Sequence, residues 1–181
     1  MTTCKLNFAT VIPIEVFTET GPASLIIKLN DRPVYEKQFA GNITHNEIIK
    51  FTEEYTDGDF NMLSFQFAGP PLTANKYLRI NSIAVNNQKL NVLNSEYFPE
   101  IDKEWWEVLS TDEKQKYEDI IYGKAGNTFG WWGEVNFYYC TGVNFKSKMR
   151  YHLNDNRILL HEQVNWIFLD KDSIKDYNKT V

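Results

Sequence analysis

The residues whose chemistry could support catalysis are few and widely spaced. The three histidines, His45, His152 and His161, show neither the His-x-x-x-His nor the His-Glu-x-x-His spacing that places two imidazoles on one helical face. The sequence has no Gly-x-Ser-x-Gly nucleophile elbow and no glycine-rich loop for a phosphate. We therefore expect a protein that is not an enzyme, with no catalytic residues, no cofactor and no metal.

A carboxylate pair for glycoside hydrolysis is harder to exclude, because the two groups need only lie about 5 to 10 Å apart in space. Glu134 stands among aromatic residues and is the best single candidate. Strand alternation sets Glu134 against Val135 and Phe137, which favours a solvent-facing position instead. Glycoside hydrolase is accordingly the third of three functional interpretations.

One acidic turn has a partial calcium-loop pattern. Asp57-Gly58-Asp59-Phe60-Asn61 carries oxygen ligands at alternate positions. An EF-hand loop counted from Asp57 would need Gly at its sixth position and Glu at its twelfth, where this chain has Met62 and Ala68. The pattern favours a solvated turn before a strand.

Neighbouring aromatic residues are the strongest binding signal. Aromatic residues make up 15% of the chain, and all five tryptophans follow position 104. The clusters at 105–106, 131–132 and 137–139 put adjacent rings on opposite faces of a strand or different sides of a helix. One interpretation is that one ring of each cluster is core and another is exposed, where it could stack on a sugar or anchor a protein interface. The alternative is that all of these rings are core. The candidate binding residues are Trp105, Trp106, Trp131, Trp132 and Tyr138.

The elements that must position these rings are mostly strands. Between Leu6 and Leu93 apolar residues alternate with polar or small ones, which is typical of strands with one buried face. Pairs rich in Gly, Pro and Asn separate the runs. They occur at positions 21–22, 30–31, 57–58, 69–71 and 86–87. The fold class is therefore all-β, with a β-sandwich or jelly-roll architecture.

One short helical insertion is expected around residues 102–122. Ser110 and Glu113 have the spacing of a capping box, and Gly123 is placed for a C-terminal stop. The preceding segment, Tyr97 to Glu100, has the pattern of an extended turn. Strand alternation resumes after Gly130.

Three regions follow from this pattern. Residues 1–94 form a sandwich portion, residues 95–169 add the helix and aromatic-rich strands that pack on or complete the same domain, and residues 170–181 form a polar tail. The net charge of −5, with no basic cluster, argues against a nucleic-acid partner. No apolar stretch approaches the roughly 18 to 20 residues of a membrane span, so no membrane partner is expected.

Residues 23–90 resemble the β-sandwich of calcium-dependent xylan-binding carbohydrate-binding modules. The resemblance is carried by the strand that contains Leu78, Ile80, Ile83 and Val85. The aspartate-rich turn that precedes this strand in the family is replaced here by residues 73–76, Thr-Ala-Asn-Lys, which lack the calcium-binding aspartates. The resemblance implies a sandwich fold without the family's calcium.

A second resemblance rests on residues 97–105 and 126–137, which contain a Tyr-x-Pro segment and a Gly-Trp-Trp-Gly motif. Together with the sandwich they look like small proteins of tailed bacteriophages of marine bacteria and cyanobacteria. That resemblance implies a non-enzymatic virion protein, made in the host cytoplasm and placed on the tail, neck or capsid surface. Its partners would be other virion proteins and further copies of itself, with a glycan as an additional partner. The alternative is a soluble carbohydrate-binding module that recognises a polysaccharide through exposed Trp and Tyr rings.

Overall fold

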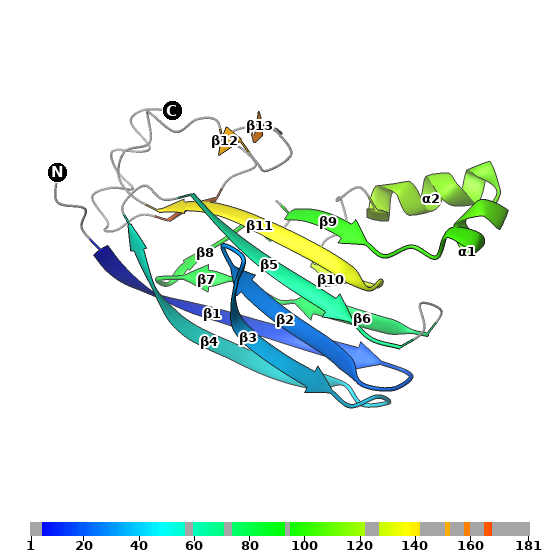
Figure 1. The fold of residues 1–181 in the computed structure, drawn as a ribbon, viewed down its shortest axis with the longest axis horizontal. Coiled ribbons are helices and arrows are strands. Elements are labelled where there is room, and N and C mark those ends of the chain that lie inside the picture. The colour runs from blue at the N-terminus through cyan, green and yellow to red at the C-terminus, as the bar shows by residue number, and fades with distance from the viewer. Residues whose placement is uncertain are drawn as a thin grey trace.

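The protein is a two-sheet all-β structure with a pair of short helices at one end (Figure 1). The helices are α1 (Lys103–Val108) and α2 (Thr111–Ile121). No helix among the described residues has the length and apolar character needed to cross a membrane. The computed structural model describes residues 5–56, 60–70, 74–92, 95–121, 127–141, 151–152, 158–159 and 165–167.

The first sheet has strand order β10-β6-β1-β7-β8, and β4 also pairs with β1. All of its pairings are antiparallel. Its strands are β1 (Lys5–Thr18), β4 (His45–Thr56), β6 (Lys76–Ile80), β7 (Ala84–Val85), β8 (Gln88–Lys89) and β10 (Thr128–Phe129).

The second sheet has strand order β14-β11-β5-β2-β3, and β9 also pairs with β11. The β11–β14 pair is parallel, and the others are antiparallel. A separate short pair joins β12 (Tyr151–His152) to β13 (Ile158–Leu159). The strands of the second sheet are β2 (Ala23–Leu29), β3 (Arg32–Phe39), β5 (Phe60–Ala68), β9 (Ser95–Pro99), β11 (Gly133–Thr141) and β14 (Asn165–Ile167).

The core lies between the two sheets and confirms the predicted sandwich. β2 and β6 alternate strictly between buried and half-buried side chains, as strands with one inward face must. The inward residues of both sheets form one apolar cluster. Its largest fully buried members are Trp132, Tyr139, Phe39, Phe65, Phe129 and Phe137.

The two open sides of the sandwich differ. On one side, β3 of the second sheet meets β4 of the first through the ion pairs Lys37–Glu47 and Arg32–Glu53. On the other side, β6 and β10 of the first sheet face β9 and β11 of the second, and the chain continues from β9 into the helices (Figure 1).

Local signals set the predicted turns and the helical insertion. Asn30 and Asp31 adopt positive φ angles of 49° and 66°, which confirms the hairpin between β2 and β3. Ser110 and Glu113 form the expected capping box, with reciprocal side-chain bonds to backbone N–H groups of 2.9 and 3.3 Å. Gly123 and the acidic turn at 57–59 lie outside the described residues.

The prediction of an extended turn at residues 97–100 was wrong. Residues 95–99 form the strand β9, whose pairing with β11 matches Tyr97 to Val135 and Pro99 to Gly133. Among the described strands β9 pairs only with β11, and Pro99 is its last residue, so the missing N–H of proline is tolerated. The strand ends beside Gly133, the first residue of β11, and the chain then continues to α1.

Candidate functional site

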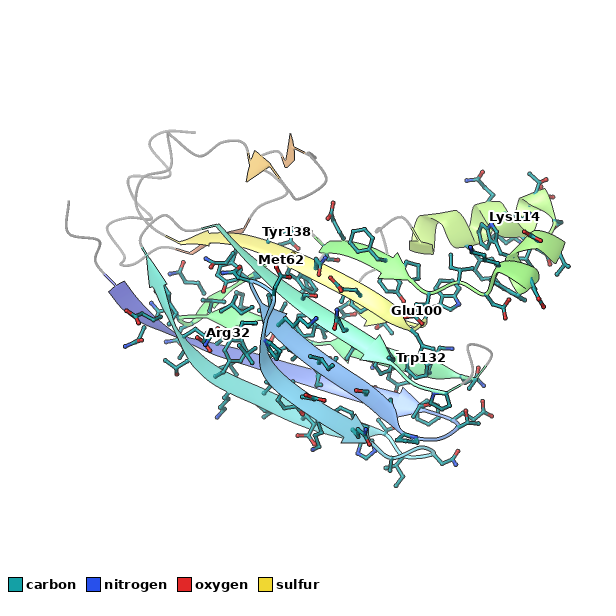
Figure 2. The ribbon with its side chains drawn as sticks, viewed as in Figure 1. Arg32, Met62, Glu100, Lys114, Trp132 and Tyr138 are labelled. Atoms are coloured by element: carbon teal, nitrogen blue, oxygen red, sulfur yellow. The ribbon has the colours of Figure 1, made fainter. Side chains whose placement is uncertain are left out.

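A pocket of about 450 Å³ opens on the helix-bearing side of the sandwich. Four segments contribute to it: residues 74–76 at the start of β6, the end of β9 through the first turn of α1, the middle of α2, and the turn between β10 and β11. Figure 2 marks the region with Glu100, which follows the end of β9. The lining residues are Ala74, Asn75, Lys76, Glu100, Asp102, Trp105, Tyr117, Gly130 and Trp131.

One wall of the pocket is aromatic. The Trp105 and Tyr117 rings meet edge to face, with centroids 5.3 Å apart and planes at 66°. Tyr117 and Trp131 repeat the arrangement at 5.8 Å and 69°. All three side chains are half-buried, so each ring has a packed part and an accessible part. Such a chain of rings is fixed in orientation and still offers apolar surface to a ligand.

The rest of the pocket is polar. Lys76 is 8% exposed, and burial lowers the pKa of its ammonium group. This group donates a 2.9 Å hydrogen bond to the Ala74 carbonyl and lies 5.0 Å from the centre of the Trp132 ring. Asn75, Glu100 and Asp102 add an amide and two carboxylates. The pocket therefore presents donors, acceptors and both signs of charge opposite its aromatic wall.

Tyr97 fixes the position of Trp131. Its hydroxyl donates a 2.8 Å hydrogen bond to the Trp131 carbonyl and accepts a 3.1 Å bond from the Trp131 N–H. Burial raises the pKa of this hydroxyl well above its usual range, so the group stays protonated at any physiological pH. The Tyr97 ring packs edge to face on Phe129 at 5.0 Å. The buried Tyr97 side chain thus hydrogen-bonds to both the N–H and the carbonyl of Trp131, a residue that lines the pocket.

The turn from Gly130 to Gly133 sends its two tryptophans to opposite sides. Trp132 is 1% exposed, its indole N–H donates a 2.7 Å hydrogen bond to the Pro70 carbonyl, and its ring packs on Phe67. Trp131 instead lines the pocket. Gly133 makes this possible with a φ of +140°, a conformation that residues with a Cβ rarely adopt.

The helices supply the other two rings of the aromatic wall. Trp105 is the third residue of α1, and the Asp102 carboxylate caps this helix by accepting a 3.1 Å hydrogen bond from the Trp105 N–H. Tyr117 comes from α2, whose start is fixed by the Ser110 capping box. Both rings therefore sit on short helices with satisfied N-termini.

The five predicted binding residues fall into three groups. Trp105 and Trp131 line the pocket. Trp106 is half-buried and packs against Trp105 at 6.2 Å, away from the lining. Trp132 and Tyr138 are interior residues, 1% and 3% exposed, and Figure 2 labels Tyr138 on β11 and Trp132 near the start of that strand. Residues 135–139 of β11 are buried on both faces, which accounts for Tyr138. Neither residue offers an exposed ring, contrary to their selection as surface candidates.

Sequence reasoning missed most of the polar wall and Tyr117. The sequence singled out Asn75 and Lys76 only as part of the turn that lacks the calcium-binding aspartates, and not as binding residues. Tyr117 is not among the predicted binding residues, although it packs against two tryptophans of the pocket wall. No spacing in the sequence links residues 75, 102 and 117, since only the folded chain brings them together.

Glu134 has a structural role in the described part of the chain. Its carboxylate accepts a 2.8 Å hydrogen bond from the Gln66 side chain of β5 and does not line the pocket. Burial raises its pKa, but hydrogen bonds from Gln66 and its neighbours outweigh this and leave the pKa lowered. A general acid needs a raised pKa, so Glu134 is poorly suited to that role.

Removal of divalent metal should leave the stability of the protein unchanged. Within the described residues there is no group of three or more His, Cys, Asp or Glu side chains that could hold a metal ion, and the Lys76 ammonium occupies the pocket wall. We expect the same melting temperature with and without a chelator. A site saturated a hundredfold would contribute about 2.7 kcal/mol, so a loss of several degrees, restored by added calcium, would contradict this expectation.

Comparisons with known proteins show only a weak structural similarity. No protein-family model matches the chain, and no curated protein matches it. A solved structure described as vCBM60 in complex with galactobiose shares 13% identity and a TM-score of 0.39, over 70% of this chain and 95% of that one. A selenomethionine form of vCBM60, from work on two families of calcium-dependent carbohydrate binding modules, gives 13% and 0.38 over 72% and 89%. At such scores the similarity carries no argument about function, and neither description mentions a bacteriophage.

Proposed function

We propose that this protein is a carbohydrate-binding protein and that the sugar occupies the aromatic pocket. The observation that carries the proposal is the pairing of Trp105, Tyr117 and Trp131 on one wall with Asn75, Lys76, Glu100 and Asp102 around it. A pyranose ring has an apolar face of C–H groups and a rim of hydroxyls. The aromatic wall suits the face and the polar groups suit the rim.

The size and polarity of the pocket support a sugar over other ligands. Its volume of about 450 Å³ lies in the range of small-molecule sites. A purely apolar ligand would leave the charged groups of the rim without hydrogen-bond partners, which is costly in a partly buried site. A simple anion would meet two carboxylates, Glu100 and Asp102, against one ammonium.

Preorganisation of the pocket also favours ligand binding. Tyr97 holds the backbone of Trp131 on both sides, and Asp102 caps the helix that carries Trp105. Rings that are already held in place lose little conformational entropy when a ligand binds. The interactions that fix the wall are therefore the ones a binding site needs.

The role in a virion stays a prediction from the sequence, together with its partners and its location on the particle. No feature of the described residues favours a role in a virion over sugar binding in the pocket. Sugar binding, which was the alternative interpretation, is accordingly the function we propose, without catalysis.

Replacement of Trp131 by alanine should abolish sugar binding while the protein remains folded. Truncation of a central aromatic contact costs about 2 kcal/mol or more, which is about a 30-fold loss of affinity. Binding would be measured by affinity electrophoresis through gels that contain xylan, galactan or soluble cellulose, followed by calorimetry with the polysaccharide that retards the protein. Trp106→Ala is the matched control, because Trp106 neighbours the pocket but does not line it.

Two outcomes would overturn the proposal. One is that no neutral polysaccharide retards the wild-type protein. The other is that a polysaccharide binds and that Trp131→Ala and Trp105→Ala both retain wild-type affinity, which would place the sugar elsewhere.

A further inference from the structure

A second polar and aromatic cluster lies on the outer face of the first sheet. We call it the outer platform and define it as Glu15 and Phe17 of β1, Tyr77 and Arg79 of β6, and Thr128 of β10. The strand register sets Glu15 opposite Arg79, Phe17 opposite Tyr77, and Thr128 opposite Arg79. All five side chains are half-buried, whereas the residues between them, such as Val16 and Leu78, are fully buried. The platform therefore faces away from the core.

The side chains of the outer platform are held together in one layer. The Phe17 and Tyr77 rings stack at 5.7 Å with planes at 26°. The Arg79 guanidinium lies 5.5 Å from the centre of the Tyr77 ring. Glu15 accepts hydrogen bonds of 2.7 Å from the Tyr77 hydroxyl and 3.2 Å from Arg79, and Arg79 donates a 3.2 Å bond to Thr128. This network orders the rings without a ligand.

The charge of the outer platform is balanced. Arg79 and Glu15 form an ion pair, and Tyr77 and Thr128 are neutral. The hydrogen bond to Glu15 raises the pKa of the Tyr77 hydroxyl, which therefore stays protonated. A surface of flat rings beside a neutralised polar network suits an uncharged ligand with hydroxyl groups better than an anion, a cation or an apolar protein surface.

The outer platform and the pocket are built from neighbouring parts of the chain: both use β6, and the pocket also uses the turn that follows β10. Lys76, which lines the pocket, directly precedes Tyr77, so their Cα atoms lie about 3.8 Å apart. Thr128 precedes the pocket residue Gly130 by two positions, which is about 7 Å along an extended chain. Because side chains alternate along a strand, Lys76 points inward to the pocket and Tyr77 points outward to the platform. A ligand that occupies both would therefore pass around the edge strand β10.

We infer that the ligand is an uncharged polysaccharide chain, of which one end occupies the pocket and the following sugars lie on the outer platform. The inference rests on the proposed function and deepens it, since the pocket alone would suit a free mono- or disaccharide equally well. The pocket and the platform then act as consecutive subsites. Affinity should rise with the length of the oligosaccharide and the rise should depend on Phe17 and Tyr77.

The test compares a disaccharide with a hexasaccharide of the polysaccharide that binds best among xylan, galactan and cellulose. By calorimetry, the wild-type protein should bind the hexasaccharide at least about tenfold more tightly. Tyr77→Ala and Phe17→Ala should remove this gain and leave the disaccharide affinity unchanged. Lys50→Ala is the control, because Lys50 is exposed on β4 opposite Val11 of the same sheet face, away from the platform. Tyr77→Phe keeps the ring and should keep most of the gain.

The failures are distinguishable. If the disaccharide binds and Trp131→Ala abolishes its binding, but the hexasaccharide binds no more tightly, the extended site is overturned and the proposed function stands. If neither sugar binds, both are overturned. If Tyr77→Ala weakens both sugars equally, or alters the oligomeric state instead of sugar affinity, the platform is not a consecutive subsite.

Discussion

Trp132→Ala should lower the free energy of unfolding by about 3 to 5 kcal/mol, the usual cost of removing a large buried aromatic side chain. Trp132 is 1% exposed and packs on Phe67 with ring centroids 4.5 Å apart. Its indole N–H donates to the Pro70 carbonyl, and the Lys76 ammonium lies over its ring. The substitution would leave a cavity and an unpartnered carbonyl in the same place.

Urea unfolding monitored by circular dichroism would measure this loss. The adjacent Trp131→Ala is the matched control, since it removes the same side chain from the same turn but from the half-buried pocket wall. We expect the midpoint of unfolding to fall far more for Trp132→Ala than for Trp131→Ala. Equal losses in the two variants would contradict the assignment of one ring to the core and the other to the pocket.

Gly133→Ala should also destabilise the protein strongly, by at least about 2 kcal/mol. A Cβ at this position would lie 2.3 Å from the Phe98 carbonyl oxygen and 2.8 Å from the Pro99 Cα atom. Both atoms belong to the backbone of β9, so the clash could be relieved only by moving that strand. The φ of +140° adds strain for any residue with a side chain.

Gly130→Ala provides the contrast within the same turn. Its added Cβ would find its nearest neighbour, the Lys76 carbonyl oxygen, 4.0 Å away, which is an ordinary contact. Thermal unfolding should therefore show a large drop in melting temperature for Gly133→Ala and little change for Gly130→Ala. A stable Gly133→Ala protein would mean that β9 does not approach β11 as closely as described.

The parts of the fold that the sequence predicted are those set by near neighbours. Alternation placed the strands around Leu25 and Leu63, positive-φ asparagine marked the hairpin at Asn30, and the Ser110–Glu113 pair marked the start of α2. Each of these signals acts within a few residues. They were sufficient for the fold class and for the helical insertion.

The pocket could be predicted only in part, because it depends on long-range pairing. Adjacent tryptophans indicated that one ring of each pair would be exposed, but the side taken by Trp131 depends on Gly133 and on the approach of β9. Asn75 lines the pocket just before β6, where hydrogen bonds join its N–H to the Glu19 carboxylate and its carbonyl to the Glu19 N–H. Strand alternation placed Tyr138 on the face of β11 opposite to Phe137 and Tyr139. Alternation cannot show that both faces of this strand are buried.

The helix α1 contains no buried residue, although it supplies Trp105 to the pocket. Its N-terminus is capped within its own segment by Asp102. Substitutions at the exposed positions of α1, which are 103, 104, 107 and 108, should thus perturb the folding of the sandwich little. On the function proposed above, ligand preference can therefore change on this surface insertion while the core of the sandwich stays constant.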